Sequence, residues 1–310
     1  MRKTGKELAL VTGGAGFIGS HLVEALVRKG VRVRVLDDLS SGSLQKLHQV
    51  IDHIELMEGD VRDLSEVMEA CRGASTIYHL AAMASIPMSM AQPHLCLAIN
   101  GEGTLNVMEA ARAQGARRLV FASSSALYGD LPGPHLEDMT LRANTPYAAS
   151  KLLGENLADF YMEHKGLHAV SLRYFNVYGP RQGAEGPDSG VIPIFIKQIS
   201  KGLPPVIYGD GEQTRDFIHV LDVVRATILA ASRKGAKGVY NVATGAQVSI
   251  NSLAELLSYL RPQAPPAVHL PARAGDPERS WGSVARAKKD LGFEAKIDLA
   301  PGLKDLLKKK

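Results

Sequence analysis

The sequence predicts an α/β protein with a doubly wound parallel sheet and a smaller α/β domain in its C-terminal part. Three observations carry this prediction. Short runs that are apolar throughout, rather than alternating, suggest strands covered on both faces. These runs alternate with segments of helical spacing, and such a βαβα order implies a parallel sheet with helices on both sides. A glycine-rich turn directly follows the first apolar run.

The N-terminal half supplies most of the expected sheet. Its expected strands, each rich in Val, Ile and Leu, are residues 8–11, 31–36, 54–57, 76–80, 119–122 and 169–173. Its expected helices are residues 19–29, 64–71, 95–114 and 147–164. We therefore expect a first domain over residues 1–175.

The C-terminal part has a different texture. Residues 179–190 and 202–211 are expected loops rich in Gly and Pro, and residues 262–277 form an extended, proline-rich segment. A helix is expected at 219–232 and one more strand of the first sheet at 239–243. We expect a second domain over residues 176–310, from which about 216–244 returns to the first.

Composition excludes several classes of protein. The chain has 310 residues, of which 45% are hydrophobic and 22% charged, so it is neither disordered nor fibrous. A net charge of +4 is too small for a nucleic-acid binder. Cys71 and Cys96 give neither a disulfide framework nor a metal cluster, which favours a reducing compartment. No apolar run is long enough to span a membrane, and we expect a cytoplasmic protein.

The glycine-rich turn predicts a dinucleotide site. Gly13, Gly16 and Gly19 separate a strand from a helix start, where backbone can approach a pyrophosphate and helix N–H groups point at it. Asp37 lies 18 residues after Gly19, at the end of the next strand. A carboxylate there accepts hydrogen bonds from the adenosine ribose and repels a 2′-phosphate, so NAD is favoured over NADP. Asp38 shares this role or is a solvated acid, and Asp60 lies beside the adenine or only forms a turn.

A second constellation carries acid/base chemistry. Tyr147 and Lys151 lie on one face of an expected helix. A tyrosine, with a reference pKa of about 10, is a poor base at neutral pH, and a nearby ammonium favours its phenolate. Ser123, Ser124 and Ser125 end an expected strand, at the edge where doubly wound sheets bind ligands. The alternatives are a chance Tyr/Lys pair on the surface and a serine-rich turn.

Several motifs occur in one order along nearly the whole chain. They are Thr12-Gly13-x-x-Gly16-x-x-Gly19, Asp37-Asp38-Leu39-Ser40-Ser41-Gly42, Gly59-Asp60-Val61, His79-Leu80-Ala81-Ala82, Asn100-x-x-Gly103-Thr104-x-Asn106, Ser123-Ser124-Ser125, Tyr147-x-x-x-Lys151 and Arg173-Tyr174-Phe175-Asn176. This set resembles the extended short-chain dehydrogenase/reductase family, a Rossmann-fold family. Within it the chain is most similar to the nucleotide-sugar epimerase/dehydratase branch, and there to the UDP-glucose 4-epimerases.

The resemblance implies roles for single residues. Tyr147 would be the catalytic acid/base, Lys151 its pKa partner and a ribose ligand, and Ser124 the hydroxyl that bridges the sugar's 4-oxygen and Tyr147. The implied NAD contacts are Gly13, Gly16, Phe17, Ile18, Gly19, Asp37, Asp38, Ser40, Gly42, Asp60, Val61, Leu80, Ala81, Ala82, Asn100, Ser123, Tyr147, Lys151, Tyr174 and Phe175.

The resemblance also implies a UDP-sugar site. Arg215 would grip the pyrophosphate, Arg273 would bind phosphate and Asp276 the uridine ribose, because the planar fork of Arg matches phosphate. For any single Arg, a surface ion pair is the alternative. We interpret His79 and His219 as packed, hydrogen-bonded residues. The implied substrate contacts are Ser85, Ser124, Asn176, Val191, Val206, Tyr208, Arg215, Arg273, Asp276 and Ser280.

Three positions discriminate within the branch. Dehydratases and decarboxylases carry further acid/base groups where this chain has Ser125 and Ala126, and an alanine moves no proton. The implied reaction is therefore epimerisation through a 4-keto sugar, with NAD reduced and reoxidised. Ser280 stands where a bulky Tyr crowds the sugar's 2-substituent in some 4-epimerases, so N-acetylated UDP-hexoses are expected substrates besides UDP-glucose and UDP-galactose. Ala84 replaces a Lys found in some 4-epimerases, which leaves the sugar open.

Alternatives remain at this point. The protein could epimerise UDP-glucuronate or a GDP-sugar, act as a sugar-nucleotide dehydratase or reductase, or sense NAD without catalysis. A homodimer is implied, through helices around 95–114 and 147–165, although their apolar residues could be ordinary core.

Overall fold

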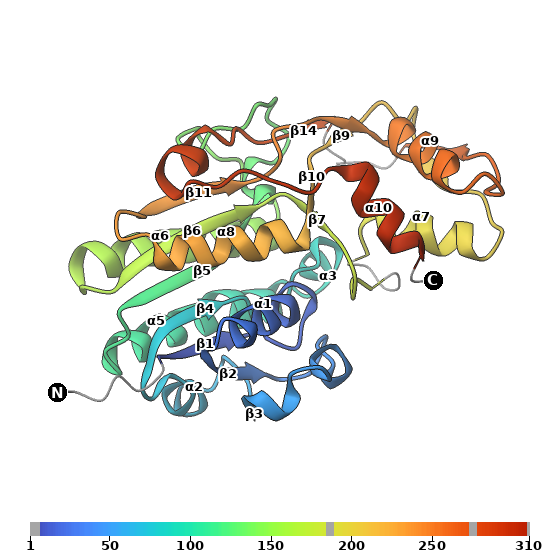
Figure 1. Cartoon of the computed structure of the whole chain (residues 1–310). Helices are drawn as coiled ribbons and strands as arrows, with labels where there is room; N and C mark the ends of the chain where they lie inside the picture. Colours follow the sequence, from blue (N-terminus) through green and yellow to red (C-terminus); the bar gives the residue numbers. More distant parts are fainter. Residues whose placement is uncertain (1–6, 184–188, 273–277, 309–310) are drawn as a thin grey trace.

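A seven-stranded parallel sheet forms the centre of the molecule (Figure 1). The computed structural model describes residues 7–183, 189–272 and 278–308. The strand order is β11-β6-β5-β4-β1-β2-β3, and every pairing in this sheet is parallel. The strands are β1 (Leu8–Thr12), β2 (Arg32–Asp37), β3 (Ile54–Glu58), β4 (Ala74–His79), β5 (Arg118–Ser124), β6 (His168–Tyr174) and β11 (Gly238–Val242). The predicted fold class is confirmed, and the strand order reverses between β1 and β4, where such sheets bind ligands.

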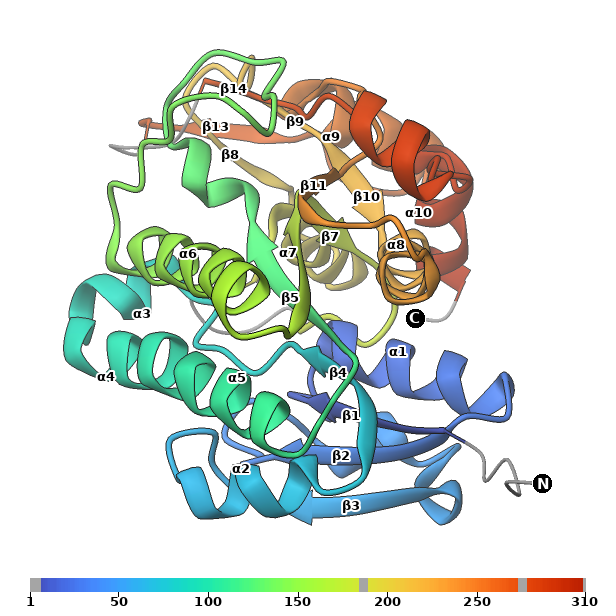
Figure 2. The ribbon, with the colours of Figure 1, turned by 90° about the vertical axis from the view of Figure 1, so that its left-hand side faces the viewer.

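Helices cover both faces of this sheet (Figure 2). On one face lie α2 (Leu64–Cys71), α5 (Gly103–Ala113) and α6 (Pro146–His164). On the other lie α1 (Phe17–Arg28) and α8 (Val220–Ser232). Each layer encloses its own cluster of fully buried aliphatic and aromatic side chains. Burial on both faces explains why the strands read as continuous apolar runs.

The helix expected at 95–114 is present in the structure, and a π-helical turn interrupts its α-helical pattern. Helix α3 (Ile86–Ala91) precedes α4 (Pro93–Leu97), and a π-helical turn, η3 (Ala98–Glu102), separates α4 from α5. A single π-turn inside a longer helix is too short to show a period of its own, so the sequence pattern did not reveal it.

The C-terminal part forms smaller sheets around a third hydrophobic cluster. Its helices are α7 (Val191–Ser200), α9 (Ile250–Leu260) and α10 (Leu299–Lys308). Its strands are β7 (Asn176–Tyr178) with β10 (Phe217–His219), β8 (Val206–Tyr208) with β13 (Val268–Leu270), and β9 (Thr214–Arg215) with β12 (Val248–Ser249) and β14 (Arg279–Ser280). Strands β8 and β13 lie where only loop was expected, because three residues are too few to show a period.

Short helical turns complete the described chain: the 3₁₀ helices η1 (Leu44–Leu47), η2 (Ile51–His53) and η4 (Ser125–Tyr128), and the π-helical η5 (Ala287–Leu291). Over the described ranges, no helix combines the length and apolar character that crossing a bilayer demands.

Candidate active site

The glycine turn between β1 and α1 packs backbone against backbone. Gly13 adopts a φ of +68°, and a Cβ there would lie 2.6 Å from the Ala81 nitrogen. A Cβ on Gly19 would lie 2.1 Å from the Gly13 carbonyl oxygen. Gly16 caps α1 without a side-chain hydrogen bond, so no capping side chain occupies the first N–H groups of the helix. This cradle fits the pyrophosphate of a dinucleotide.

Asp37 lies beside this turn, at the end of β2. Its carboxylate is buried and accepts hydrogen bonds from the Ala15 N–H at 2.8 Å and the Leu39 N–H at 2.9 Å. Burial raises the pKa of Asp37, and the two N–H donors oppose that rise. A Cβ on Gly42 would come within 2.6 Å of the Asp37 Oδ1 atom, so the following loop closes on the carboxylate. This arrangement fits the predicted contact with the adenosine ribose.

The other acids near this end serve local turns. Asp38 is exposed and accepts hydrogen bonds from the Ser40 N–H and hydroxyl. Asp60 pairs with the Arg62 guanidinium, which lowers the pKa of Asp60. The contacts of Asp60 in this structure are therefore those of a residue that forms a turn.

The segment after β4 closes the other side of the cradle. Leu80 donates its N–H to the Thr12 carbonyl, and Leu80, Ala81 and Ala82 are all partly exposed. Asn100 is buried, and its amide binds both the N–H and the carbonyl of Met83 as well as the Ser150 hydroxyl. Asn100 thus holds the 80–85 loop in place.

Helix α6 brings the predicted acid/base pair to the carboxyl end of β5. The Thr145 hydroxyl caps the helix, and Tyr147 lies in its first turn, partly exposed. Lys151 is buried and donates from Nζ to the Ala122 carbonyl at 2.8 Å. The same Nζ lies 5.8 Å from the centre of the Tyr147 ring. Burial lowers the pKa of Lys151 to about 8.

Two adjacent serines of β5 have different partners. The Ser124 hydroxyl, partly exposed at the strand end, accepts a hydrogen bond from the Ala126 N–H. The Ser123 hydroxyl is buried and donates to the Glu155 carboxylate at 2.5 Å. The structure therefore brings Ser124 to the edge beside α6, while Ser123 is bound within the protein.

Two further residues assigned to the cofactor are buried. The Tyr174 hydroxyl lies 2.8 Å from the Thr227 hydroxyl on α8, and burial raises the pKa of Tyr174. Phe175 packs against Tyr128 and Gly282; a Cβ on Gly282 would lie 2.6 Å from the Phe175 ring. In this structure the side chains of Tyr174 and Phe175 therefore pack inside the protein.

Five of the ten predicted substrate residues line one cavity of about 220 Å³: Asn176, Val191, Val206, Tyr208 and Arg215. Because β7, α7, β8 and β9 converge there, it is lined by Asn176, Val191, Val206, Ile207, Tyr208, Gln213, Arg215 and Ile250. The N-terminus of α7 opens on it through Val191, and Gly190 caps that helix without a side chain. Of these lining residues, the sequence did not reveal Ile207, Gln213 and Ile250. Gln213 lies inside the motif around Arg215, so the sequence could have identified it as a substrate contact. No motif in the sequence contains Ile250.

Two other predicted substrate residues, Ser280 and Ser85, are not among those that line this cavity. Ser280 is buried and pairs with Arg215 between β14 and β9. The Ser85 hydroxyl is buried and caps α3 through the Met88 N–H. Arg273 and Asp276 lie outside the described residues.

The two histidines are packed as interpreted. His79 bridges the Thr12 and Thr104 hydroxyls at 2.7 and 2.9 Å, and burial lowers its pKa to about 3. His219 caps α8 through the Leu221 N–H and packs edge-on against Tyr178.

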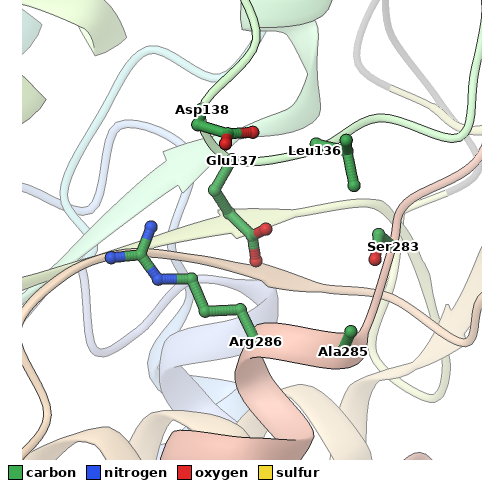
Figure 3. A pocket seen from close by; sticks show the side chains of 6 residues that line it. All are labelled: Leu136, Glu137, Asp138, Ser283, Ala285 and Arg286. Carbon is green, nitrogen blue, oxygen red and sulfur yellow. The ribbon is translucent and has the colours of Figure 1, made fainter.

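A second cavity, of about 260 Å³, was not expected (Figure 3). It is lined by Leu136, Glu137, Asp138, Ser283, Ala285 and Arg286. Figure 3 shows the Glu137 side chain directed toward the segment that carries Ser283 and Arg286. Its Oε1 atom accepts a hydrogen bond from the Asn241 N–H at 2.9 Å.

Several known proteins resemble this chain over nearly its whole length. A family model described as the NAD dependent epimerase/dehydratase family matches residues 9–243. A UDP-glucose 4-epimerase of Mycolicibacterium smegmatis is 38% identical over 301 residues, which cover 95% of each chain. A UDP-glucuronate 4-epimerase of Thermodesulfobacterium geofontis is 33% identical, covering 95% of this chain and 93% of the relative. A UDP-N-acetyl-alpha-D-glucosaminuronate decarboxylase of Bacillus cytotoxicus is 32% identical, covering 97% of each.

Two solved structures are similar over the whole fold. The Thermus thermophilus UDP-glucose 4-epimerase complex with NAD has a TM-score of 0.87 at 38% identity, covering 96% of each chain. The UDP-N-acetylglucosamine 4-epimerase of Methanobrevibacter ruminantium, in complex with UDP-N-acetylmuramic acid, has a TM-score of 0.93 at 36% identity. It covers 98% of this chain and 99% of that chain.

Proposed function

Because the chain belongs to the NAD dependent epimerase/dehydratase family, we propose that it is a UDP-hexose 4-epimerase. Its substrates are UDP-glucose and UDP-galactose, and the N-acetylated UDP-hexoses as well. NAD is held by residues 1–175 with the returning 216–244, and the UDP-sugar by the remainder of 176–310.

One observation carries this proposal: Tyr147, Lys151 and Ser124 gather at the carboxyl end of β5, next to Ala126. Lys151 is fixed between the Ala122 carbonyl and the Tyr147 ring. Two positions follow Ser124 toward Tyr128, Ser125 and Ala126, and Ala126 offers no group that moves a proton. Dehydration and decarboxylation need such a group, whereas inversion at a carbinol carbon needs one acid/base.

In the proposed mechanism the same residues serve the oxidation and the reduction of the sugar. Tyr147, as phenolate, accepts the proton of the sugar's 4-hydroxyl group, and the Ser124 hydroxyl bridges the two oxygens. Lys151 stabilises the phenolate through its positive charge. Held by the glycine turn and Asp37, NAD would supply the acceptor and later the donor of the hydride at carbon 4 of the sugar. Tyr147 then gives the proton back, so no net oxidation occurs.

The cavity of about 220 Å³ supports a diphosphate-linked substrate. Arg215, Asn176 and the N-terminus of α7 meet there, and all three attract or hydrogen-bond anions. Val206 and the Tyr208 ring line the cavity and offer apolar contact to a base. Anchoring at the diphosphate leaves the sugar free to present either face, which inversion at carbon 4 requires.

The position of Ser280 supports the wider substrate range. Because Ser280 pairs with Arg215 across β14 and β9, the side chain at position 280 lies next to the residue proposed to bind the diphosphate. A serine there is small, which leaves room for an N-acetyl group.

A substrate panel without added cofactor tests the proposal. The purified protein is incubated with UDP-galactose, UDP-N-acetylgalactosamine and UDP-galacturonate, and products are separated and weighed by mass spectrometry. We expect the gluco epimer from the first two, with unchanged mass. A keto or deoxy product, or turnover of the uronate alone, would refute the proposed reaction or its substrate. Turnover of UDP-galactose without the N-acetyl sugar would refute only the wider range.

The same family membership leads us to propose a homodimer. Large apolar side chains are exposed on four neighbouring helices of one face, α3 to α6 (Figure 2). These residues are Met90, Leu97, Leu105, Leu153 and Phe160, each 40–60% exposed. Exposed apolar side chains on neighbouring helices are typical of an interface, and a second copy of the chain is the occupant we propose.

A further inference from the structure

A row of three polar side chains crosses three adjacent strands of the main sheet. Ser123 on β5 lies opposite Arg173 on β6, and Arg173 lies opposite Asn241 on β11. Neighbours in register point to the same side of a sheet, so all three side chains face one way. All three are buried, one residue before the carboxyl edge of β5 and β6.

Glu155 of helix α6 closes this row. Its carboxylate accepts hydrogen bonds from Arg173 Nε at 2.9 Å and Nη2 at 2.7 Å, and from the Ser123 hydroxyl at 2.5 Å. The side chains of Glu155 and Arg173 are each only 4% exposed. Arg173 also donates to the Tyr128 hydroxyl, which in turn donates to Asn241. A buried ion pair with this many hydrogen bonds has a geometry that a small movement would break.

The pair acts on α6 at the turn next to the proposed active-site residues. Tyr147, Lys151 and Glu155 follow one another at intervals of four residues and share one face of the helix. Gly154 lets the helix approach closely, since a Cβ there would lie 2.3 Å from the Phe121 ring. The Lys151 Nζ atom lies 5.0 Å from the centre of the same ring. Rotation of α6 about its axis would therefore displace Glu155 and Lys151 together.

We propose that Glu155 is a positioning residue, whose ion pair with Arg173 locks α6 so that the Lys151 ammonium stays between the Ala122 carbonyl and Tyr147. The inference rests on the proposed function, because Lys151 matters there as the partner of Tyr147. It assigns a role to two charged residues that touch neither cavity.

Charge adds to this positioning. Burial lowers the pKa of Lys151 to about 8, and electrostatic interactions with Cys96 and with the Glu155 carboxylate oppose that fall. The groups that face Lys151 are Tyr147 and Glu155 on α6, Cys96 on α4 and His79 on β4, with Arg173 behind Glu155. Removing the Glu155 charge leaves Arg173 as an unpaired cation, which makes Lys151 release its proton at lower pH.

The test compares Glu155→Gln with Glu109→Gln in the NAD-bound protein. Glu109 on α5 is a 40% exposed carboxylate that binds the Tyr161 hydroxyl near the far end of α6, away from Lys151. We expect the alkaline limb of kcat to move about one pH unit lower in Glu155→Gln and to stay in place in Glu109→Gln. If Glu155→Gln does not fold, Glu155→Asp is used, with a smaller shift in the same direction expected.

A purely structural role gives a different result. Loss of fold lowers the active fraction at every pH and leaves the limb in place, and that outcome would overturn the inference. If the wild type epimerises no UDP-sugar, the proposed function fails, and the inference is tested by ¹³C NMR titration of Lys151 in lysine-labelled protein. A Lys151 pKa that is the same with and without the Glu155 carboxylate would then refute it.

Discussion

Ser123 and Ser124 are neighbours in the chain, yet their hydroxyls belong to different parts of the molecule. Ser124 ends β5 at the ligand edge, and Ser123 binds the buried Glu155 carboxylate. The sequence identified Tyr147, Lys151 and the serine run, because their spacing and order are local. The sequence analysis assigned Ser123 to the cofactor, because no local pattern reveals that its hydroxyl binds a carboxylate 32 residues away. Side-chain partners across a sheet require the fold.

The first prediction concerns Tyr147. Tyr147→Phe removes the only atom that carries the transferred proton, and we expect kcat to fall by about 10²–10⁴. Bound NAD, measured by absorbance after denaturation, should be retained. Tyr161→Phe, a matched change on the same helix with its hydroxyl on Glu109, should leave kcat within a factor of about two. Full activity of Tyr147→Phe would remove Tyr147 from the mechanism.

The second prediction concerns His79. Because burial lowers its pKa to about 3, the imidazole should remain neutral between pH 6.5 and 3. In that window the unfolded chain binds a proton that the folded chain does not, so His79 makes the protein less stable as pH falls. Long-range ¹H–¹⁵N NMR, assigned with His79→Asn, reads its protonation directly. Titration near pH 6.5 would contradict the buried hydrogen-bonded state.

Elements differ in how well the sequence revealed them. Each strand of the main sheet was predicted to within a residue or two, because burial on both faces makes an apolar run unmistakable. The π-turn at Ala98–Glu102 and the short strands β8 and β13 were missed. These elements depend on contacts between residues far apart in the sequence. Asn100 in the π-turn binds the 80–85 loop, and β8 forms by pairing with β13.

The third prediction tests the contact between α1 and the glycine turn. Gly19→Ala places a methyl group 2.1 Å from the Gly13 carbonyl, so α1 must move away from β1. We expect a loss of about 1–3 kcal/mol in the free energy of unfolding and a lower NAD content. Gly235→Ala, where nothing lies within 4 Å of the new methyl, is the control and should change neither. Wild-type NAD content in Gly19→Ala would mean that this contact does not shape the cofactor site.

At the scale of the whole molecule, Asp216 ties the sheets together. Its buried carboxylate accepts hydrogen bonds from the Thr244 N–H and hydroxyl and from the Gly245 N–H, and burial raises its pKa. Its carbonyl accepts a hydrogen bond from the Asn176 N–H. Segments that line the substrate cavity are thus joined directly to the strand end at β11. The sequence indicated that residues 216–244 return to the first sheet, but not that one carboxylate makes the junction.

The fourth prediction concerns association of two chains. Phe160→Glu places a charge on the exposed apolar surface of α6, and we expect it to convert a dimer into a monomer. Light scattering after size-exclusion chromatography should give twice the mass of one chain for the wild type and the mass of one chain for the variant. Tyr259→Glu, at a side chain 82% exposed on α9, is the control and should remain dimeric. A monomeric wild type would refute the proposed dimer.

The late arrival of β11 has a consequence for synthesis on the ribosome. Strand β6 is complete at Tyr174, but its outer edge stays unpaired until Gly238 to Val242 emerge. At ~5–20 residues per second, the roughly 64 residues between them take about 3–13 s to translate. During that interval a nascent chain presents the open edge of a hydrophobic strand, which can pair with other chains. Slow translation across residues 175–238 should therefore increase aggregation and the need for chaperones more than the same delay placed after residue 242.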